Sequence, residues 1–201
     1  MSEFQALYAR FVDRYRHDIC AYAKDIHGLE FDRLQRPIVL ALQNGAKYVT
    51  VRSGHGVGKT KLLSVVVSHF CNTRYPWRVP MTAPTAKQLW DGLWPEVRAR
   101  FAELPGYLGQ NFDVMAERIT LKQDPDNCFV SPRTTSKDHP EALQGIHSEN
   151  VLIIGDEASG IPDEVFVSGQ GSISGPSAQT LLAGNPTKRS NFEFYYTLSR
   201  Q

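Results

Sequence analysis

One stretch decides the fold of this chain, and it reads Val51-Arg52-Ser53-Gly54-His55-Gly56-Val57-Gly58-Lys59-Thr60. Residues 47–51 alternate in the manner of a β-strand, and residues 62–70 carry apolar side chains at helical spacing. A glycine-rich turn between a strand and a helix directs backbone N–H groups and the positive end of the helix dipole at one point. The spacing therefore predicts a phosphate-binding loop, in which Lys59 reaches the β- and γ-phosphates of a nucleotide and Thr60 holds Mg²⁺.

The loop departs from the strict pattern at one position, because Ser53 stands where that pattern has glycine. The glycines at positions 54, 56 and 58 still allow the backbone to adopt positive φ angles. The alternative is a glycine-rich turn that contains Gly-Lys-Thr by chance. The strand before the loop and the helix after it favour the phosphate-binding interpretation.

A second segment supports the first, since residues 151–154 form a continuous apolar run that ends in Gly155, Asp156 and Glu157. Such a run is typical of a strand buried on both faces of a parallel sheet, and ligands bind at the carboxyl ends of these strands. We expect Asp156 to contact the Mg²⁺ shell in the Walker B role and Glu157 to act as general base toward water. An apolar strand ending in two carboxylates is by itself more often structural, and the phosphate-binding loop earlier in the chain favours catalysis.

The composition is that of a single globular domain. The chain has 201 residues, 41% of them hydrophobic, and a formal net charge of +1, so any nucleic-acid partner must bind a local patch or a ring of subunits. Three widely spaced cysteines show neither zinc-ligand spacing nor a disulfide framework, which favours a reducing compartment. No apolar run approaches the ~20 residues that a membrane span needs, and the N-terminus lacks the pattern of a signal peptide.

The pattern along the rest of the chain predicts alternating helices and strands. Taken together, the segments indicate an α/β fold in which a mostly parallel β-sheet is flanked by helices. The predicted elements are one amphipathic helix within 1–27, a helix over 34–42, a strand over 78–85 with Pro80 at its start, a helix over 86–101, a hairpin of 119–122 with 128–130, a short helix from 163, and a strand over 178–183.

With these segments in place, the chain resembles the ATPase domain of the large terminase subunit, the DNA-packaging motor of tailed phages. The resemblance covers nearly the whole chain and follows the order of four family motifs. These are Ser-Gly-His-Gly-Val-Gly-Lys-Thr at 53–60, Thr-Ala-Pro-Thr at 82–85, Glu-Ala-Leu-Gln-Gly-Ile-His at 141–147 with Ile-Gly-Asp-Glu-Ala-Ser at 154–159, and Leu-Ala-Gly-Asn-Pro-Thr at 182–187.

The resemblance implies a P-loop NTPase of the additional-strand, catalytic-glutamate type that binds ATP and Mg²⁺. It implies a single domain, with a helical segment at 1–46 that includes adenine-side residues and an ATPase core at 47–201. Asn185 takes the family's place of γ-phosphate sensor, and Gln35 that of the adenine-recognising glutamine. The alternative for Gln35 is an exposed helix glutamine, and Gln43 lies near it in the sequence. The nucleotide-binding residues implied are Gln35, Gly54, His55, Gly56, Val57, Gly58, Lys59 and Thr60.

Two departures from the family pattern concern arginine. Many members carry an arginine inside the phosphate-binding loop, where this chain has His55, and others carry one shortly before Walker B, where this chain has Gln144. The arginine finger therefore does not transfer by position. Arg52 and Arg133 remain as candidates, and Arg133 is preferred because it precedes Walker B within a polar segment.

The family resemblance also implies partners and a setting. The partners are double-stranded DNA, the portal protein and procapsid, a small terminase subunit, and further copies of the chain in a ring. The expected setting is the cytoplasm of the infected bacterial host, with no membrane partner and no place in the mature virion. The sequence stops soon after the coupling motif, so we expect an ATPase core without its C-terminal end, no nuclease domain, and no DNA cleavage. Two alternatives remain open: another P-loop nucleic-acid motor such as a helicase, and a nucleotide-dependent interaction module with little hydrolysis.

Overall fold

The structure is a computed structural model, and it describes residues 3–54, 56–135, 143–169 and 177–185. Its helical elements alternate with strands, as the sequence pattern predicts. The helices are α1 (Glu3–Tyr15), α2 (Ile19–His27), α3 (Arg36–Gln43), α4 (Lys59–Thr73), α5 (Ala86–Gln88), the π-helical turn η1 (Leu89–Leu93), α6 (Trp94–Ala102), α7 (Gly106–Gly109), the 3₁₀ turn η3 (Ala158–Gly160) and α8 (Asp163–Gly169). The strands are β1 (Tyr48–Arg52), β2 (Trp77–Thr82), β3 (Phe112–Val114), β4 (Ile119–Leu121), β5 (Phe129–Pro132), β6 (Asn150–Gly155) and β7 (Gln179–Gly184).

The strands form one 7-stranded sheet in the order β1-β7-β6-β2-β5-β4-β3. The first five strands in this order run parallel, and β4 and β3 complete the edge as antiparallel strands. Because β1, β7 and β6 are parallel neighbours, the segments that follow them meet at one edge of the sheet. This carboxyl edge therefore brings together the residues after 52, 155 and 184.

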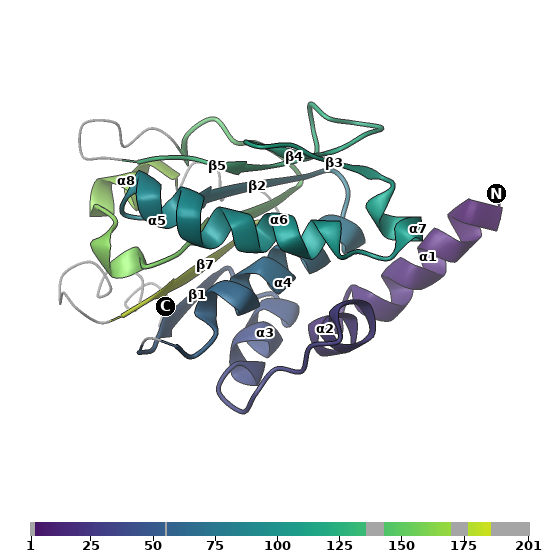
Figure 1. The fold of residues 1–201 in the computed structure, drawn as a ribbon, viewed down its shortest axis with the longest axis horizontal. Coiled ribbons are helices and arrows are strands. Elements are labelled where there is room, and N and C mark those ends of the chain that lie inside the picture. The colour runs from purple at the N-terminus through teal and green to yellow at the C-terminus, as the bar shows by residue number, and fades with distance from the viewer. Residues whose placement is uncertain (1–2, 55, 136–142, 170–176, 186–201) are drawn as a thin grey trace.

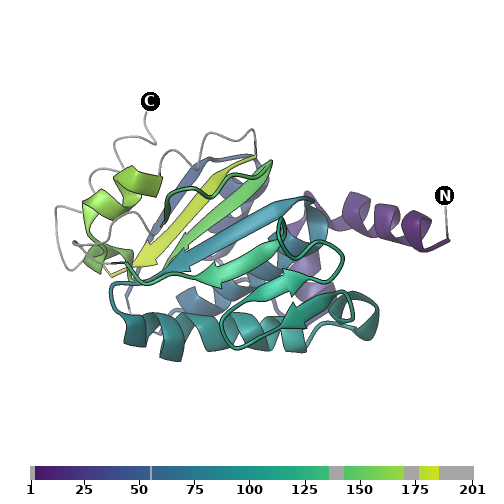
Figure 2. The same ribbon diagram turned by 90° about the horizontal axis from the view of Figure 1, so that it is seen from above.

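Helices cover both faces of the sheet (Figures 1 and 2). On β6, Leu152 and Ile154 pack into the larger core, beside α2, α4 and α6, whereas Val151 and Ile153 pack into a second cluster with residues of α8. This alternation follows from the period of two in a strand, and it explains why the sequence of β6 is apolar without interruption. The sheet is thus the middle layer of three, and α1 reaches furthest from it in Figure 2.

Helix α4 is the central helix of the larger core. Every residue from Leu62 to Thr73 is buried, including the polar side chains of Ser68, His69 and Asn72. These polar groups are hydrogen-bonded: Ser68 pairs with the Tyr22 hydroxyl at 2.8 Å, and Asn72 donates to the same hydroxyl at 3.1 Å. Burial on all sides holds the helix, and the loop at its start, in a fixed place on the sheet.

Three details differ from the sequence expectation. Residues 1–27 do not form one helix, since α1 ends at Tyr15 and α2 begins at Ile19. The break occurs because the Asp18 side chain accepts a hydrogen bond from Ala21 N at 2.8 Å and so caps a new helix. The helix predicted over 86–101 contains the π-helical turn η1, and strand β3 was not predicted at all.

The expected place of Pro80 is also wrong, because it lies inside β2, a central strand, and not at its start. Its carbonyl side still pairs with β5, where it lies opposite Ser131. On the β6 side the ladder joins Arg78 to Val151 and Met81 to Ile154, and it is interrupted between them. Proline has no N–H to donate, so the interruption accommodates it. None of the described helices is long and apolar enough to cross a membrane.

Candidate active site

The loop between β1 and α4 has the backbone that a phosphate-binding loop requires. Gly56 and Gly58 adopt φ angles of 77° and 74°, in the left-handed region that favours glycine. Gly58 is the N-cap of α4, so the first free N–H groups of that helix face the loop. The structure therefore supports the predicted strand–loop–helix unit, while His55 lies outside the described residues.

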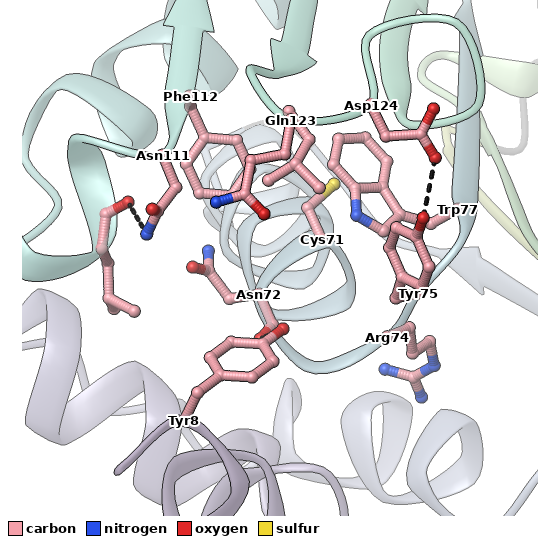
Figure 3. A pocket seen from close by; sticks show the side chains of 12 residues that line it. Tyr8, Cys71, Asn72, Arg74, Tyr75, Trp77, Asn111, Phe112, Gln123 and Asp124 are labelled. Carbon is pink, nitrogen blue, oxygen red and sulfur yellow. Dashed lines mark hydrogen bonds between the residues drawn. The ribbon is translucent and has the colours of Figure 1, made fainter. Parts of the chain in front are cut away.

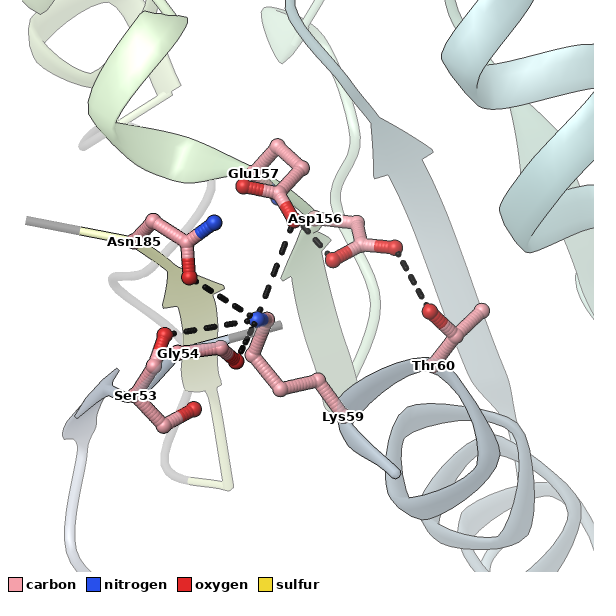
Figure 4. Close-up of polar contacts among 7 residues, drawn as sticks. All are labelled: Ser53, Gly54, Lys59, Thr60, Asp156, Glu157 and Asn185. Atoms are coloured by element: carbon pink, nitrogen blue, oxygen red, sulfur yellow. Dashed lines mark hydrogen bonds and ion pairs between the residues drawn. The ribbon is translucent and has the colours of Figure 1, made fainter. Parts of the chain in front are cut away.

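The ammonium group of Lys59 is the meeting point of the site (Figure 4). It donates to the carbonyl oxygens of Ser53 at 3.4 Å and Gly54 at 2.8 Å, and to the amide oxygen of Asn185 at 3.2 Å. The carboxylate of Glu157 lies 3.8 Å away, and the Lys59 side chain is 8% exposed. These contacts bring together the segments after β1, β6 and β7, so three strands position one cation.

Thr60 and Asp156 form the second contact of the site. The Thr60 hydroxyl donates to Asp156 Oδ2 at 3.1 Å, and the backbone N–H of Glu157 donates to Asp156 Oδ1 at 2.9 Å. Burial is the main influence on Asp156 and raises its pKa above the ordinary value, and the two hydrogen bonds oppose this shift. A hydroxyl and a carboxylate oxygen at this spacing are hard donors of the kind that Mg²⁺ prefers, so the residues fit the predicted metal role.

Glu157 has a strained backbone next to this pair. Its φ of 47° makes it the single non-glycine residue with positive φ among the described residues. Such conformations persist where the surrounding structure enforces them, and they cluster at functional sites. Here the enforcing contact comes from Gly184, where an added Cβ would lie 2.8 Å from the backbone N of Ala158 and 3.2 Å from the backbone C of Glu157. The end of β7 therefore packs directly on the turn that carries Glu157.

Gln35 lies immediately before α3 and touches the phosphate-binding loop. Its side-chain nitrogen donates to the Val57 carbonyl at 3.1 Å, and its side-chain oxygen accepts from Asp32 N at 3.2 Å. It also lines a cavity of about 290 Å³ beside the loop, together with apolar side chains that include Leu34 and Ile38. An apolar slot next to a phosphate-binding loop is suited to a planar base, and Gln35 stands at its edge.

The candidate arginines lie apart from this cluster. Arg133 follows β5 and donates from Nε to Ser131 Oγ at 3.3 Å, and burial, with Arg118 and Arg78 nearby, lowers its pKa. In the sheet order β5 is separated from β1 by three strands. Arg52 is exposed at the end of β1. Neither arginine has a printed contact with Lys59, so the described site within one chain is built without them.

A second hollow opens on the other side of Glu157. It has a volume of about 480 Å³ and brings the Thr-Ala-Pro-Thr segment and helix η1 up to the catalytic carboxylates. Its lining residues are Pro84, Gln88, Gly92, Asp156, Glu157, Ser159, Gly160 and Asn185. The pocket beside Gln35 and this hollow therefore lie on opposite sides of Lys59 and Glu157, which line one cavity each.

Sequence reasoning missed the part that glycines play in holding this site together. Besides Gly184, a Cβ at Gly155 would lie 2.7 Å from Leu182 Cδ2, and one at Gly160 would lie 2.7 Å from Pro84 Cγ. These three contacts clamp the Walker B turn between β7 and the segment after β2. A glycine at the end of an apolar strand is a signal of close backbone approach, and it was available in the sequence.

With this geometry described, comparisons with known proteins become informative. No protein-family model matches the chain. A curated relative from Enterobacteria phage P7, described as a probable terminase large subunit, is 28% identical over 185 residues, which cover 90% of this chain and 37% of the relative. The chain thus spans just over a third of that protein's length.

Solved structures agree with this relative. The large terminase ATPase domain of Thermus phage P74-26 superposes with a TM-score of 0.61 at 19% identity, over 85% of this chain and 71% of that one. The chain resembles the ATPase domain of a large terminase. The large terminase of a thermophilic bacteriophage, solved in complex with ADP, gives a TM-score of 0.59 at 14% identity over 79% of that resemblance's usual extent, or more exactly 78% of this chain and 39% of that one. The terminase-like domain therefore has the fold of a P-loop NTPase.

Proposed function

We propose that this terminase-like domain hydrolyses ATP and thereby powers the translocation of double-stranded viral DNA into procapsids. One observation carries the proposal: Lys59 contacts Asn185 at 3.2 Å and Glu157 at 3.8 Å, at the end of a phosphate-binding loop. Phosphate-binding cation, catalytic carboxylate and polar sensor are thus on neighbouring strands within reach of one γ-phosphate.

The roles follow from the chemistry of each group. Lys59 and the loop N–H groups neutralise the charge that develops on the transferred phosphoryl group. Glu157 accepts a proton from the attacking water, and its placement beside Lys59 keeps that water next to the γ-phosphate. Thr60 and Asp156 would hold Mg²⁺, which when bound supplies neutralisation of the phosphate oxygens. Gln35 would contact the adenine at the edge of the slot beside the loop.

Asn185 is suited to report the state of the nucleotide. Its amide oxygen accepts from Lys59 at 3.2 Å, and a γ-phosphate at this place competes for the same ammonium group. Asn185 directly follows Gly184, which packs on the backbone of Glu157. A change at Asn185 is therefore transmitted to β7 and to the Glu157 turn together, which couples hydrolysis to movement of the chain after residue 185.

The catalytic arginine is proposed to come from a neighbouring copy in a ring. Arg133 has no printed contact with Lys59 within the described chain, and the hollow of about 480 Å³ beside Glu157 offers an approach for a side chain from outside. An arginine finger supplied in trans is a known device of P-loop hydrolases. Double-stranded DNA, the portal and procapsid, and a small terminase subunit are the proposed partners, in keeping with the relatives described as large terminases.

The decisive experiment separates binding from chemistry with two isosteric variants. Glu157→Gln keeps the shape of the side chain and removes the base, so hydrolysis should fall by about 10²–10⁴-fold while Mg-ATP binding is retained. Asp156→Asn should weaken the Mg²⁺ dependence and the binding of nucleotide together. Phosphate release measured with and without DNA and procapsids then tests the motor role. ATP hydrolysis at the normal rate by Glu157→Gln would refute the proposal, as would wild-type hydrolysis that DNA and procapsids leave unchanged in the case of its packaging part.

A further inference from the structure

A second site for negative charge lies at the opposite edge of the sheet from Lys59. A cleft of about 170 Å³ opens at the amino ends of β1 and β7, whose carboxyl ends carry the active site. Its polar lining comes from the turn after α1, the end of α3, and the segments after α4 and before β1 and β7. The charged and amide residues of this lining are Arg16, His17, Gln43, Lys47, Arg74 and Gln179.

Arg74 forms the inner wall of this basic cleft. Its guanidinium lies 4.5 Å from the centre of the Phe70 ring and donates to Thr73 Oγ1 at 3.0 Å. Burial lowers its pKa to about 10, with a further lowering from Arg16. Figure 3 shows Arg74 at the rim of a separate aromatic cavity, with its guanidinium turned away from Phe112. The charged end therefore does not serve that aromatic cavity.

Arg16 approaches the same point from another element. Its Nη1 donates to the Thr73 carbonyl at 3.3 Å, so the two guanidinium groups bind the same residue at the end of α4. The electrostatic effect reaches further into the core, because burial followed by Arg74, His17 and Arg16 lowers the pKa of His69 to about 3. Like charges held together in this way disfavour the folded state unless a negative group compensates them.

The described lining supplies no such group, since none of the residues that form the cleft is acidic. Its two amides are also committed elsewhere: Gln43 Oε1 accepts from Ile19 N at 3.2 Å, and Gln179 Nε2 donates to the Leu42 carbonyl at 2.8 Å. The neighbouring Arg14 shows the contrast, because it pairs with Asp25 at 2.7 Å. Partial capping of α4 by Arg16 explains one of the cations and leaves Arg74 and Lys47 without a role.

We propose that the basic cleft binds a phosphate group, held by Arg16 and Arg74 with Lys47 at its mouth. Guanidinium groups donate to phosphate oxygens in a fork geometry, and lysine adds a compact charge. The phosphate belongs either to the backbone of double-stranded DNA or to a free anion. The DNA source rests on the proposed motor function, and it would place a backbone contact at the edge of the sheet remote from ATP.

The test compares Arg16→Gln/Lys47→Gln with Arg10→Gln, which removes an exposed cation from α1. Binding of a DNA duplex is measured by fluorescence anisotropy over a series of salt concentrations, and folding is checked by thermal melting. For the cleft variant we expect about tenfold weaker DNA binding near 0.1 M salt and a salt slope reduced by about one to two. Arg10→Gln should bind DNA as the unsubstituted chain does, and both variants should keep its basal ATP hydrolysis.

A second arm identifies a free anion as the source. Inorganic phosphate is added to Lys59→Ala protein, so that the phosphate-binding loop does not contribute, and the melting temperature is followed. If phosphate stabilises this protein, and stabilises Lys59→Ala/Arg16→Gln/Lys47→Gln less, the cleft binds free phosphate. If the cleft substitutions change neither DNA affinity nor phosphate stabilisation, the proposal is overturned. That result, with DNA-stimulated hydrolysis intact, would leave the motor function standing. Loss of hydrolysis stimulation with intact cleft binding would do the reverse.

Discussion

The two ends of helix α4 hold opposite kinds of chemistry. At its start, Gly58 adopts positive φ, and Lys59 and Thr60 meet the carboxylates of the Walker B turn. At its end, Arg16 and Arg74 bind Thr73 with no acidic residue in the described lining. The positive end of a helix dipole favours an anion, so the first end needs only backbone and one lysine, whereas the negative end must gather several cations to attract one. The comparison shows how one buried helix fixes two polar sites about 20 Å apart, as its 15 residues imply.

The largest effect that sharpens this comparison concerns the first end and a neighbouring subunit. If Arg133 completes the site in trans, hydrolysis per subunit should rise with protein concentration, by up to about 10³–10⁵-fold on full assembly. Arg133→Ala should remove that rise and spare ATP binding. Mixtures of Arg133→Ala with Glu157→Gln subunits should recover some phosphate release, because each supplies what the other lacks. A mixture as inactive as its components, or a dilute monomer already at full activity, would rule out a finger in trans.

A smaller effect tests the clamp on Glu157. In Gly184→Ala the new Cβ meets the backbone N of Ala158, so the Glu157 turn must shift and hydrolysis should fall by about 10²-fold. Nucleotide affinity should change little, since Lys59 and its loop are on another strand.

Gly106→Ala is the matched control for this substitution. Nothing lies within 4 Å of a Cβ at Gly106, which starts the short helix α7, so rate and affinity should stay as they were. Equal hydrolysis by Gly184→Ala and the unsubstituted chain would show that the close approach of β7 does not position Glu157.

The smallest effect concerns the second end of α4. The buried ring of His69 donates to the Tyr15 carbonyl at 2.7 Å, and its folded pKa of about 3 is below the ordinary 6.5. Below pH 6.5 the unfolded chain takes up a proton that the folded chain refuses, so this group lowers stability as pH falls toward 3. The loss is about 1.4 kcal/mol per pH unit within that window.

Urea unfolding at pH 7 and pH 5.5 measures this loss. His69→Gln keeps an amide donor for the Tyr15 carbonyl and removes the titrating group, so the fall in unfolding free energy between the two pH values should be smaller in this variant. An unchanged difference would show that other groups, such as the half-buried His27, whose pKa is lowered to about 4, dominate the pH dependence.

The sequence predicted the parts of the molecule that depend on local pattern. The strand–loop–helix unit, the buried β6, the 119–130 hairpin and the mostly parallel sheet are all confirmed. The motifs also predicted that Lys59 and Asp156 belong together, because carboxyl ends of parallel strands meet at one edge. Their catalytic roles, and those of Asn185, Gln35 and Arg133, stay predictions.

What the sequence did not predict depends on tertiary contact. Pro80 is tolerated in a central strand because the ladder to β6 is interrupted beside it. The split of α1 from α2 depends on a single cap at Asp18. The positive φ of Glu157 results from the packing of Gly184 against its turn, which no periodicity encodes. The basic cleft likewise joins residues up to 163 positions apart, from Arg16 to Gln179.

The most direct test of the account is nucleotide binding by Lys59→Ala. The ammonium group of Lys59 is the one point at which the segments after β1, β6 and β7 meet, so its loss removes a charge-assisted donor from the most anionic end of ATP. Calorimetric titration with Mg-ATP should show binding to the unsubstituted chain and none that is measurable in the variant, at an unchanged melting temperature or a higher one. Unaltered affinity in a properly folded Lys59→Ala protein would contradict the assignment of this loop as the ATP site.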